Sequence, residues 1–198
     1  MTKKLRQIAF GDIPELYELF SRAQIKRENS EGRTNGFYEY NLSFDSFRDR
    51  VKISNQDGFG LVLKEGERIR AYLLAYRPSQ AREISDEVLR QVEVPSDTVY
   101  VDQLCVSPGV QLHQVGRMVD AWNEFLHPRN IIQIFSAVPW KPWRNFASTR
   151  LNIARGYKKQ GVVSGQGWDL AIFGKPVWRV GRPLGEFQIQ FEEGVKND

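Results

Sequence analysis

The chain has 198 residues, of which 41% are hydrophobic, and its formal net charge is +4 at pH 7. Five Trp, seven Tyr and twelve Phe supply many large apolar side chains, which excludes a disordered chain and fits one domain with a packed core. A single cysteine excludes an internal disulfide, and together with only two distant histidines it argues against a dedicated zinc site.

The same features bear on location and partners. No segment has the apolar length of a membrane-spanning helix, and the basic residues 1–6 are not followed by the apolar run of a secretory leader. We therefore expect a cytoplasmic protein with no membrane partner and no bound metal. The modest positive charge favours anionic ligands in general. It does not by itself indicate nucleic acid, which we do not expect as a partner.

The first part of the chain is expected to form a strand and two helices. Apolar residues within 3–10 suggest a strand, and Asp12 with Glu15 three residues later matches a capping box at the start of a helix. Residues 24–41 are polar and rich in Gly, Asn and charge, as in a loop. A second, short helix is expected over residues 43–53.

Two further strands are expected at residues 59–64 and 69–76. They flank the sequence Glu65-Gly66-Glu67, so we expect them to pair as an antiparallel hairpin. The connection that follows, residues 77–97, allows a short helix near 83–91.

The most informative segment, residues 99–126, reads as strand, loop and helix. The strand ends at Val106-Ser107-Pro108-Gly109, because Pro108 has no N–H to donate and Gly109 permits a tight turn. The free N–H groups at the start of the helix, with the helix dipole behind them, form a site suited to phosphate. One helix face carries the apolar residues Leu112, Val115, Val119, Trp122 and Leu126.

The rest of the chain completes a mixed sheet. A strand, a helix and two more strands are expected at 131–138, 145–154, 157–163 and 168–173, and residues 186–191 alternate as an added edge strand does. Hairpins and crossovers together predict an α+β fold: a mixed, mostly antiparallel twisted sheet of about seven strands flanked by helices. We expect residues 1–176 to form one domain and residues 177–198 a C-terminal extension.

Two motifs in the second half of the chain resemble those of a known family. The first is Gln111-Leu112-His113-Gln114-Val115-Gly116, and the second sets Asn145, Ser148, Asn152, Gly156 and Tyr157 at fixed spacings. They are similar to Gln/Arg-x-x-Gly-x-Gly/Ala and to Asn-x-x-Ala-x-x-x-Tyr-x-x-x-Gly-Phe of the GNAT superfamily of acyl-CoA N-acyltransferases, and the likeness spans residues 3–176. Two positions depart from the pattern: Gln114 replaces the middle glycine, and Asn152 replaces a tyrosine that often protonates the departing thiolate.

The resemblance implies the GNAT fold and an N-acetyltransferase that moves an acetyl group from acetyl-CoA to a primary amine by direct attack. It implies that main-chain groups of the strand pair with the pantetheine arm and that N–H groups at the helix start hold the pyrophosphate. The cofactor-binding residues that it implies are Leu104, Cys105, Val106, Gln111, Leu112, His113, Gln114, Val115, Gly116, Arg117 and Asn145. The acceptor, a small-molecule or a protein amine, stays open, and so does a homodimer.

Asp102 is the candidate catalytic residue. An amine is mostly protonated at neutral pH, so a carboxylate base helps the reaction, and the family's acidic residue sits on this strand. Strand alternation predicts that Tyr100, Asp102, Leu104 and Val106 share one face. The plainer alternative is a buried acid paired with a nearby Arg or Lys. Tyr100 and Tyr157 are the phenols available as proton donors, and neither matches the position of the missing tyrosine.

Other features have more than one interpretation. Asn145 either contacts the cofactor or caps the helix that follows it, and Cys105 is read as a small core residue rather than a nucleophile. The sequence Trp140-Lys141-Pro142-Trp143-Arg144 either covers a ligand, stacks on a nucleobase, or is held to the core by its aromatic rings.

Three functions follow from these observations. The two motifs favour the N-acetyltransferase. The substitutions Gln114 and Asn152 suggest as an alternative a catalytically degenerate GNAT-fold module that binds CoA or another anionic partner without turnover. A nucleic-acid-associated protein is the weakest reading and rests on the basic charge and the Trp-rich sequence.

Overall fold

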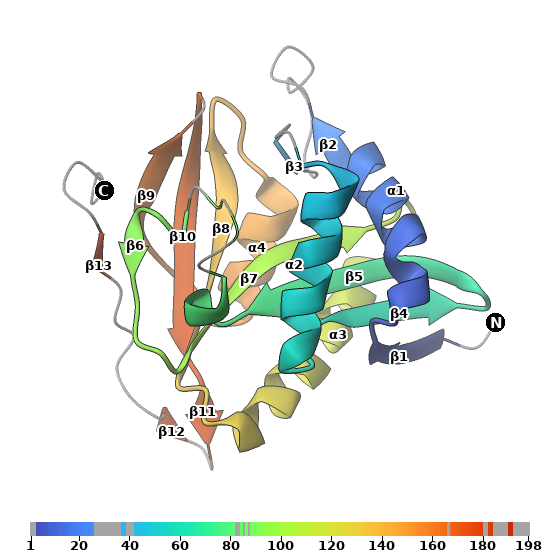
Figure 1. Cartoon of the computed structure of the whole chain (residues 1–198). Coiled ribbons are helices and arrows are strands. Elements are labelled where there is room, and N and C mark those ends of the chain that lie inside the picture. Colours follow the sequence, from blue (N-terminus) through green and yellow to red (C-terminus); the bar gives the residue numbers. More distant parts are fainter. Residues whose placement is uncertain are drawn as a thin grey trace.

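A seven-stranded mixed sheet forms the centre of the molecule in a computed structural model (Figure 1). The structure describes residues 3–25, 37–38, 42–81, 84, 86, 88–165, 167–179, 182–183 and 190–191. The strand order is β1 (Lys3–Gln7), β4 (Leu61–Glu65), β5 (Arg68–Tyr76), β7 (Thr98–Val106), β8 (Gln133–Lys141), β10 (Trp168–Pro176) and β9 (Lys158–Gly165). Neighbouring strands are antiparallel except β7 and β8, which are parallel. The predicted fold class is confirmed.

Helices cover both faces of the sheet (Figure 1). On one face lie α1 (Ile13–Ala23) and α2 (Phe44–Gln56), and on the other lie α3 (Leu112–Leu126) and α4 (Phe146–Ala154). Among the described helices, none has the length and apolar character needed to cross a membrane. The shorter elements are η1 (Phe10–Asp12), β2 (Gln24–Ile25), β3 (Phe37–Tyr38), η3 (Pro78–Gln80), β6 (Val92–Glu93), η4 (His127–Arg129), β11 (Trp178–Arg179), β12 (Arg182–Pro183) and β13 (Gln190–Phe191).

Hydrophobic clusters lie on both faces of the sheet, and two of them pack beneath the helices. Beneath α3 and α4, Trp122 is fully buried, and its indole N–H donates to the carbonyl oxygen of Phe59 at 3.0 Å. Beneath α1 and α2, Phe20, Phe47 and Tyr72 are fully buried. Full burial of one such ring contributes about 1.5–3 kcal/mol, so these two cores hold the helices firmly to the sheet.

Some expected elements differ from the structure. The capping box of Asp12 and Glu15 is wrong. The Asp12 carboxylate instead accepts two hydrogen bonds from Arg6 at 2.6 and 2.7 Å, and Glu15 accepts the main-chain N–H of Ile69 at 2.8 Å. The partners Arg6 and Ile69, outside the helix, replace the local cap that the spacing suggested.

Parts of two other expectations fall outside the described residues. The helix near 83–91 includes residues 83, 85 and 87, which are not described, and residues 88–90 form a turn. Of the expected edge strand 186–191, only β13 is described. It pairs with β6 and does not join the seven-stranded sheet.

A β-bulge interrupts β7 at Asp102. Val101 and Gln103 pair with consecutive residues of β5, so Asp102 is the extra residue between them. A bulge of this kind breaks the ladder locally and turns a side chain to a new direction.

The bulge overturns the prediction that four residues of β7 share one face. Tyr100 and Asp102 lie on the α2 face, whereas Leu104 and Val106 pack against the core beneath α3 and α4. The prediction was wrong because alternation with period two assumes an unbroken ladder.

Candidate active site

β7 and β8 diverge after a short parallel pairing. Their ladder has four pairs, from Thr98 with Gln133 to Val101 with Ser136. Beyond it, residues 102–106 of β7 and 137–141 of β8 are all described, and no pairing joins them. One edge of β7 therefore keeps main-chain groups free of a neighbouring strand, which is where another extended group can bind.

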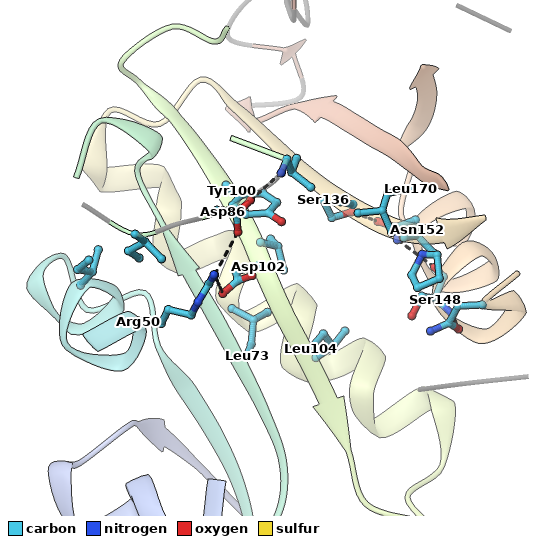
Figure 2. A pocket seen from close by; sticks show the side chains of 18 of the residues that line it. Arg50, Leu73, Asp86, Tyr100, Asp102, Leu104, Ser136, Ser148, Asn152 and Leu170 are labelled. Carbon is cyan, nitrogen blue, oxygen red and sulfur yellow. Dashed lines mark hydrogen bonds and ion pairs between the residues drawn. The ribbon is translucent and has the colours of Figure 1, made fainter. Parts of the chain in front are cut away.

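A cavity of about 710 Å³ lies at this divergence and is lined from both faces of the sheet (Figure 2). Its volume is within the range of small-molecule sites. The lining on the α3 and α4 face includes Leu73, Leu104, Val119, Trp122, Leu151 and Tyr157, and the lining on the α2 face includes Ile53, Ile84, Val88, Tyr100, Asp102 and Leu170. We call this cavity the cleft.

The three β7 residues expected to bind pantetheine lie differently. Leu104 lines the cleft, and both Leu104 and Val106 pack against the core beneath α3 and α4. Cys105 points to the opposite face, where its thiol lies 3.7 Å from the carbonyl oxygen of Leu19. Burial raises the pKa of this thiol to about 12, so Cys105 is the inert core residue of the plainer interpretation.

The start of α3 is partly exposed and does not line the cleft. Leu112, His113 and Arg117 are exposed, whereas the Val115 side chain lies in the core. The carbonyl oxygen of Gln111 accepts the main-chain N–H groups of residues 114 and 115 at 2.9 and 3.4 Å. The N–H groups that such a helix leaves for a ligand are therefore those before residue 114.

Gln114 lies beside a second, smaller cavity. This cavity of about 150 Å³ is also lined by Arg70 of β5, Glu65 of β4 and Gly109. Gln114 is not among the residues that line the cleft, so the residue that replaces the family's middle glycine does not block it.

Arg155, which follows α4, bridges α4 and α3. Its guanidinium is ion-paired with Asp120 of α3 at 3.0 Å and also lines the cleft. A Cβ added at Gly116 would clash with Nη2 of Arg155, so the glycine leaves the space that this cation fills. Burial lowers the pKa of Lys175, which donates to the carbonyl oxygen of Arg155, to about 8.

Replacing Gly116 by alanine should displace the Arg155 guanidinium from Asp120. The net change in unfolding free energy should stay within about 1 kcal/mol, because alanine favours the helix by about 1 kcal/mol and an exposed ion pair contributes about as much or less. Urea denaturation measures this, and Asp120→Asn is the matched control for loss of the pair. A loss of about 3 kcal/mol or more would contradict a movable Arg155.

Asn145 and Asn152 both line the cleft from α4. Asn145 is the N-cap of α4, and its side-chain oxygen accepts the N–H of Ser148 at 2.9 Å. Asn152 donates to the carbonyl oxygen of Ser148 at 2.9 Å and accepts the Ser136 hydroxyl of β8 at 3.1 Å. The position of the missing tyrosine is thus a hydrogen-bonded amide with no acidic proton (Figure 2).

Asp102 pairs with a buried arginine (Figure 2). Nη1 of Arg50, from α2, lies 2.8 Å from the Asp102 carboxylate, 3.1 Å from that of Asp86 and 3.0 Å from the Tyr76 hydroxyl. Asp102 therefore satisfies the plainer interpretation of a paired acid and still lines the cleft. Burial raises its pKa, and the nearby Asp86 carboxylate acts in the same direction, whereas Arg50 opposes both.

The two phenols named as available proton donors line the cleft. Tyr100 stacks on Phe135 with ring centroids 4.8 Å apart, and Tyr157 lies beneath α4. Burial raises the pKa of Tyr157 above the ordinary range of a phenol, which makes it a weaker acid.

The Trp-rich sequence is held by its own rings. Trp143 is buried and packs perpendicular to Trp168, with centroids 6.4 Å apart. The Arg144 guanidinium lies 3.3 Å above the ring of Trp140. These contacts match the interpretation of a segment fixed to the core, and the buried Trp143 ring leaves no face for a nucleobase.

Comparisons with solved structures identify the architecture. The ribosomal-protein-S18-alanine N-acetyltransferase of Escherichia coli superposes with a TM-score of 0.60 at 15% identity, covering 93% of this chain and 99% of that one. A GNAT superfamily phosphinothricin acetyltransferase of Sinorhizobium meliloti, solved with acetyl-CoA, gives 0.61 at 17% identity, covering 98% and 96%. The protein has the GNAT fold. The PaiA N-acetyltransferase of Thermoplasma acidophilum, in complex with coenzyme A, gives 0.61 at 10% identity, covering 89% and 99%.

These identities show the GNAT fold alone. No protein-family model matches the sequence, and no curated protein matches it at a significant level. The described residues contain no group of three or more His, Cys, Asp or Glu side chains arranged to hold a metal ion.

Sequence reasoning missed three residues of the site: Arg50, Asp86 and Ser136. Arg50 lies on a helix whose other polar residues are mostly exposed, so only its spacing from Phe47 and Val51 marks it as inward-facing. Asp86 contacts Arg50, and Ser136 contacts Asn152, between segments that are distant in the sequence, and no local pattern encodes such contacts.

Proposed function

We propose that this protein is an N-acetyltransferase that moves an acetyl group from acetyl-CoA to a primary amine by direct attack in the cleft. One observation carries the proposal: the cleft is lined from both faces of the sheet, beside an unpaired edge of β7. Two reactants can therefore enter from opposite faces and meet at Asp102. Two GNAT-fold neighbours, solved with coenzyme A and with acetyl-CoA, support acetyl-CoA as the acetyl donor.

The residues present fit acetyl-CoA on the α3 and α4 face. The free edge of β7 at Leu104 offers main-chain groups to an extended pantetheine arm, and the start of α3 offers N–H groups and the helix dipole to a diphosphate. Arg155 adds a positive charge between α3 and α4. When bound, acetyl-CoA supplies the thioester carbonyl that the amine attacks.

Asp102 is the proposed base. Its carboxylate takes a proton from the acceptor ammonium, directly or through a water, so that an N–H bond breaks, an O–H bond forms and the neutral amine carries the lone pair that attacks. A carboxyl whose pKa is raised by burial is a stronger base than a solvated one. The amide of Asn152 cannot protonate the leaving thiolate, so its proton comes from the amine or from water.

The second candidate function is a module that binds CoA without turnover. The observation that favours it is the amide at position 152, which is hydrogen-bonded to Ser136 where the family pattern has its tyrosine. Both candidates require CoA binding, and only the first predicts release of free thiol from acetyl-CoA in the presence of an amine.

Saturating CoA should stabilise the protein against heat. At about 100 times the dissociation constant the gain is about 2.7 kcal/mol, which corresponds to about 5 to 11 °C in Tm for a chain of this size. Arg155→Met should reduce the shift, because it removes a cation from the proposed phosphate side, and Arg48→Met on the outer face of α2 is the control. No shift at millimolar CoA would contradict both candidate functions.

A further inference from the structure

Arg50 is a fully buried cation. Its side chain is 2% exposed, and it projects from α2 toward the sheet (Figure 2). A buried guanidinium loses the hydration that it has in water, which costs several kcal/mol unless good partners replace the water. The residue therefore belongs to a specific arrangement rather than to general packing.

More oxygen atoms lie within hydrogen-bond distance of Nη1 of Arg50 than this nitrogen has N–H groups. Nη1 carries two N–H groups, yet three oxygens lie within 3.1 Å of it, from Asp102, Asp86 and Tyr76. The two carboxylates are themselves 5% and 7% exposed. Strengthening the bond to one carboxylate therefore weakens the bond to the other.

The two carboxylates differ in what else holds them. The second oxygen of Asp86 accepts the main-chain N–H groups of Val88 and Leu89 at 2.9 and 3.1 Å, so its position is fixed by its own turn. Asp102 sits on the bulge of β7 and lines the cleft. Asp86 belongs to the connection between β5 and β7, which also lines the cleft at Ile84 and Val88.

We propose that Arg50 is a positioning residue that holds Asp102 toward the cleft, and that Asp86 competes with Asp102 for Nη1 and thereby sets the strength of Asp102 as a base. This inference rests on the proposed function. With both carboxylates ionised, the three side chains carry a net charge of −1 beside the cleft. An approaching ammonium neutralises that charge. After its proton has passed to Asp102, the three side chains have no net charge.

Among the described residues, the charged and titratable groups that act on Asp102 include Arg50 from α2, Asp86 from the β5–β7 connection and Tyr76 from β5. Tyr100, from β7 itself, lies on the same face of the sheet. The Tyr76 hydroxyl also hydrogen-bonds Asp102 and favours its ionised form. Asp86 is the group among them that opposes ionisation of Asp102 by charge, so it is the side chain to change.

The test is Asp86→Asn with two readouts. The titration midpoint of Asp102 is followed by ¹³C NMR of the aspartate carboxyl carbons, its signal being assigned by loss in Asp102→Asn. We expect the midpoint to fall by about one pH unit or more, because a like charge is removed and Arg50 turns to Asp102. The acidic limb of kcat/KM should fall by the same amount. Asp45→Asn, an exposed carboxylate on α2, is the matched control and should shift neither.

An unchanged midpoint in Asp86→Asn would overturn the inference, whether or not the protein turns over. A shifted midpoint in a protein that acetylates no amine would support the shared Arg50 and contradict the proposed function instead. Arg50→Lys gives a second check. Because its ammonium lacks the fork of the guanidinium, kcat should fall by a larger factor than KM changes. An equal effect on both, with the Asp102 midpoint unmoved, would contradict the positioning role.

Discussion

Replacing Asp102 by asparagine should lower kcat/KM for amine acetylation about 100-fold or more at neutral pH, which is the usual contribution of a general base. Asparagine keeps the size of the side chain and cannot take a proton. The loss should shrink as the pH rises toward the pKa of the acceptor amine, since less of the amine then needs deprotonation. Thiol release from acetyl-CoA measures the rate with a panel of polyamines, amino acids and peptides with free amino groups.

The same variant should keep its fold and its affinity for CoA. Without the Asp102 charge, Arg50 still pairs with Asp86, so one buried cation faces one buried carboxylate. Isothermal titration with CoA is the control, and its dissociation constant should match that of the unmodified protein. A rate that stays within about twofold of the original across the pH range would remove Asp102 from the mechanism.

Replacing Arg50 by methionine should destabilise the protein by about 3 to 5 kcal/mol at neutral pH, or about 6 to 20 °C in Tm. The change leaves Asp86 and Asp102 buried side by side with no cation between them. Urea denaturation followed by tryptophan fluorescence measures the loss. The triple variant Arg50→Met, Asp86→Asn and Asp102→Asn removes all three of these charges and should recover most of the lost stability.

The Arg50→Met deficit should also depend on pH with a definite sign. Folding raises the pKa of Asp102, so the folded state binds more protons than the unfolded state, and stability falls as the pH rises through the folded-state pKa. Loss of the cation raises this pKa further. The deficit should therefore be larger at pH 8 than at pH 5, and an equal deficit at both would show that packing, not charge, is what Arg50 supplies.

Much of the fold was predictable because turn residues and the spacing of apolar residues indicate it locally. The turn at Pro108 and Gly109 and the apolar face of α3 each depend on residues within one or two turns of chain. Leu112, which was predicted on that face, is exposed, so the buried face begins at Val115. Gly109 has a φ of 83°, as a tight turn of this kind requires. The strand bounds differ by a few residues, because pairing partners decide where a strand ends.

The site was less predictable because its key features depend on distant partners. Asp102 was identified as a candidate, yet the bulge that turns it away from Leu104 arises from pairing with β5. Arg50 lies 52 residues before Asp102 in the sequence, and nothing near either residue signals the other.

The parallel ladder between β7 and β8 divides the sheet into two antiparallel halves, one of four strands and one of three. In the described residues, the four residue pairs between β7 and β8 are the only strand pairing that joins the two halves, and the cleft begins where this pairing ends. If β7 and β8 moved further apart to admit a bulkier acceptor, the hydrogen bonds of these four pairs would be lost. A change of acceptor should therefore require substitutions in α2 and in the β5–β7 connection, while the spacing between β7 and β8 is preserved.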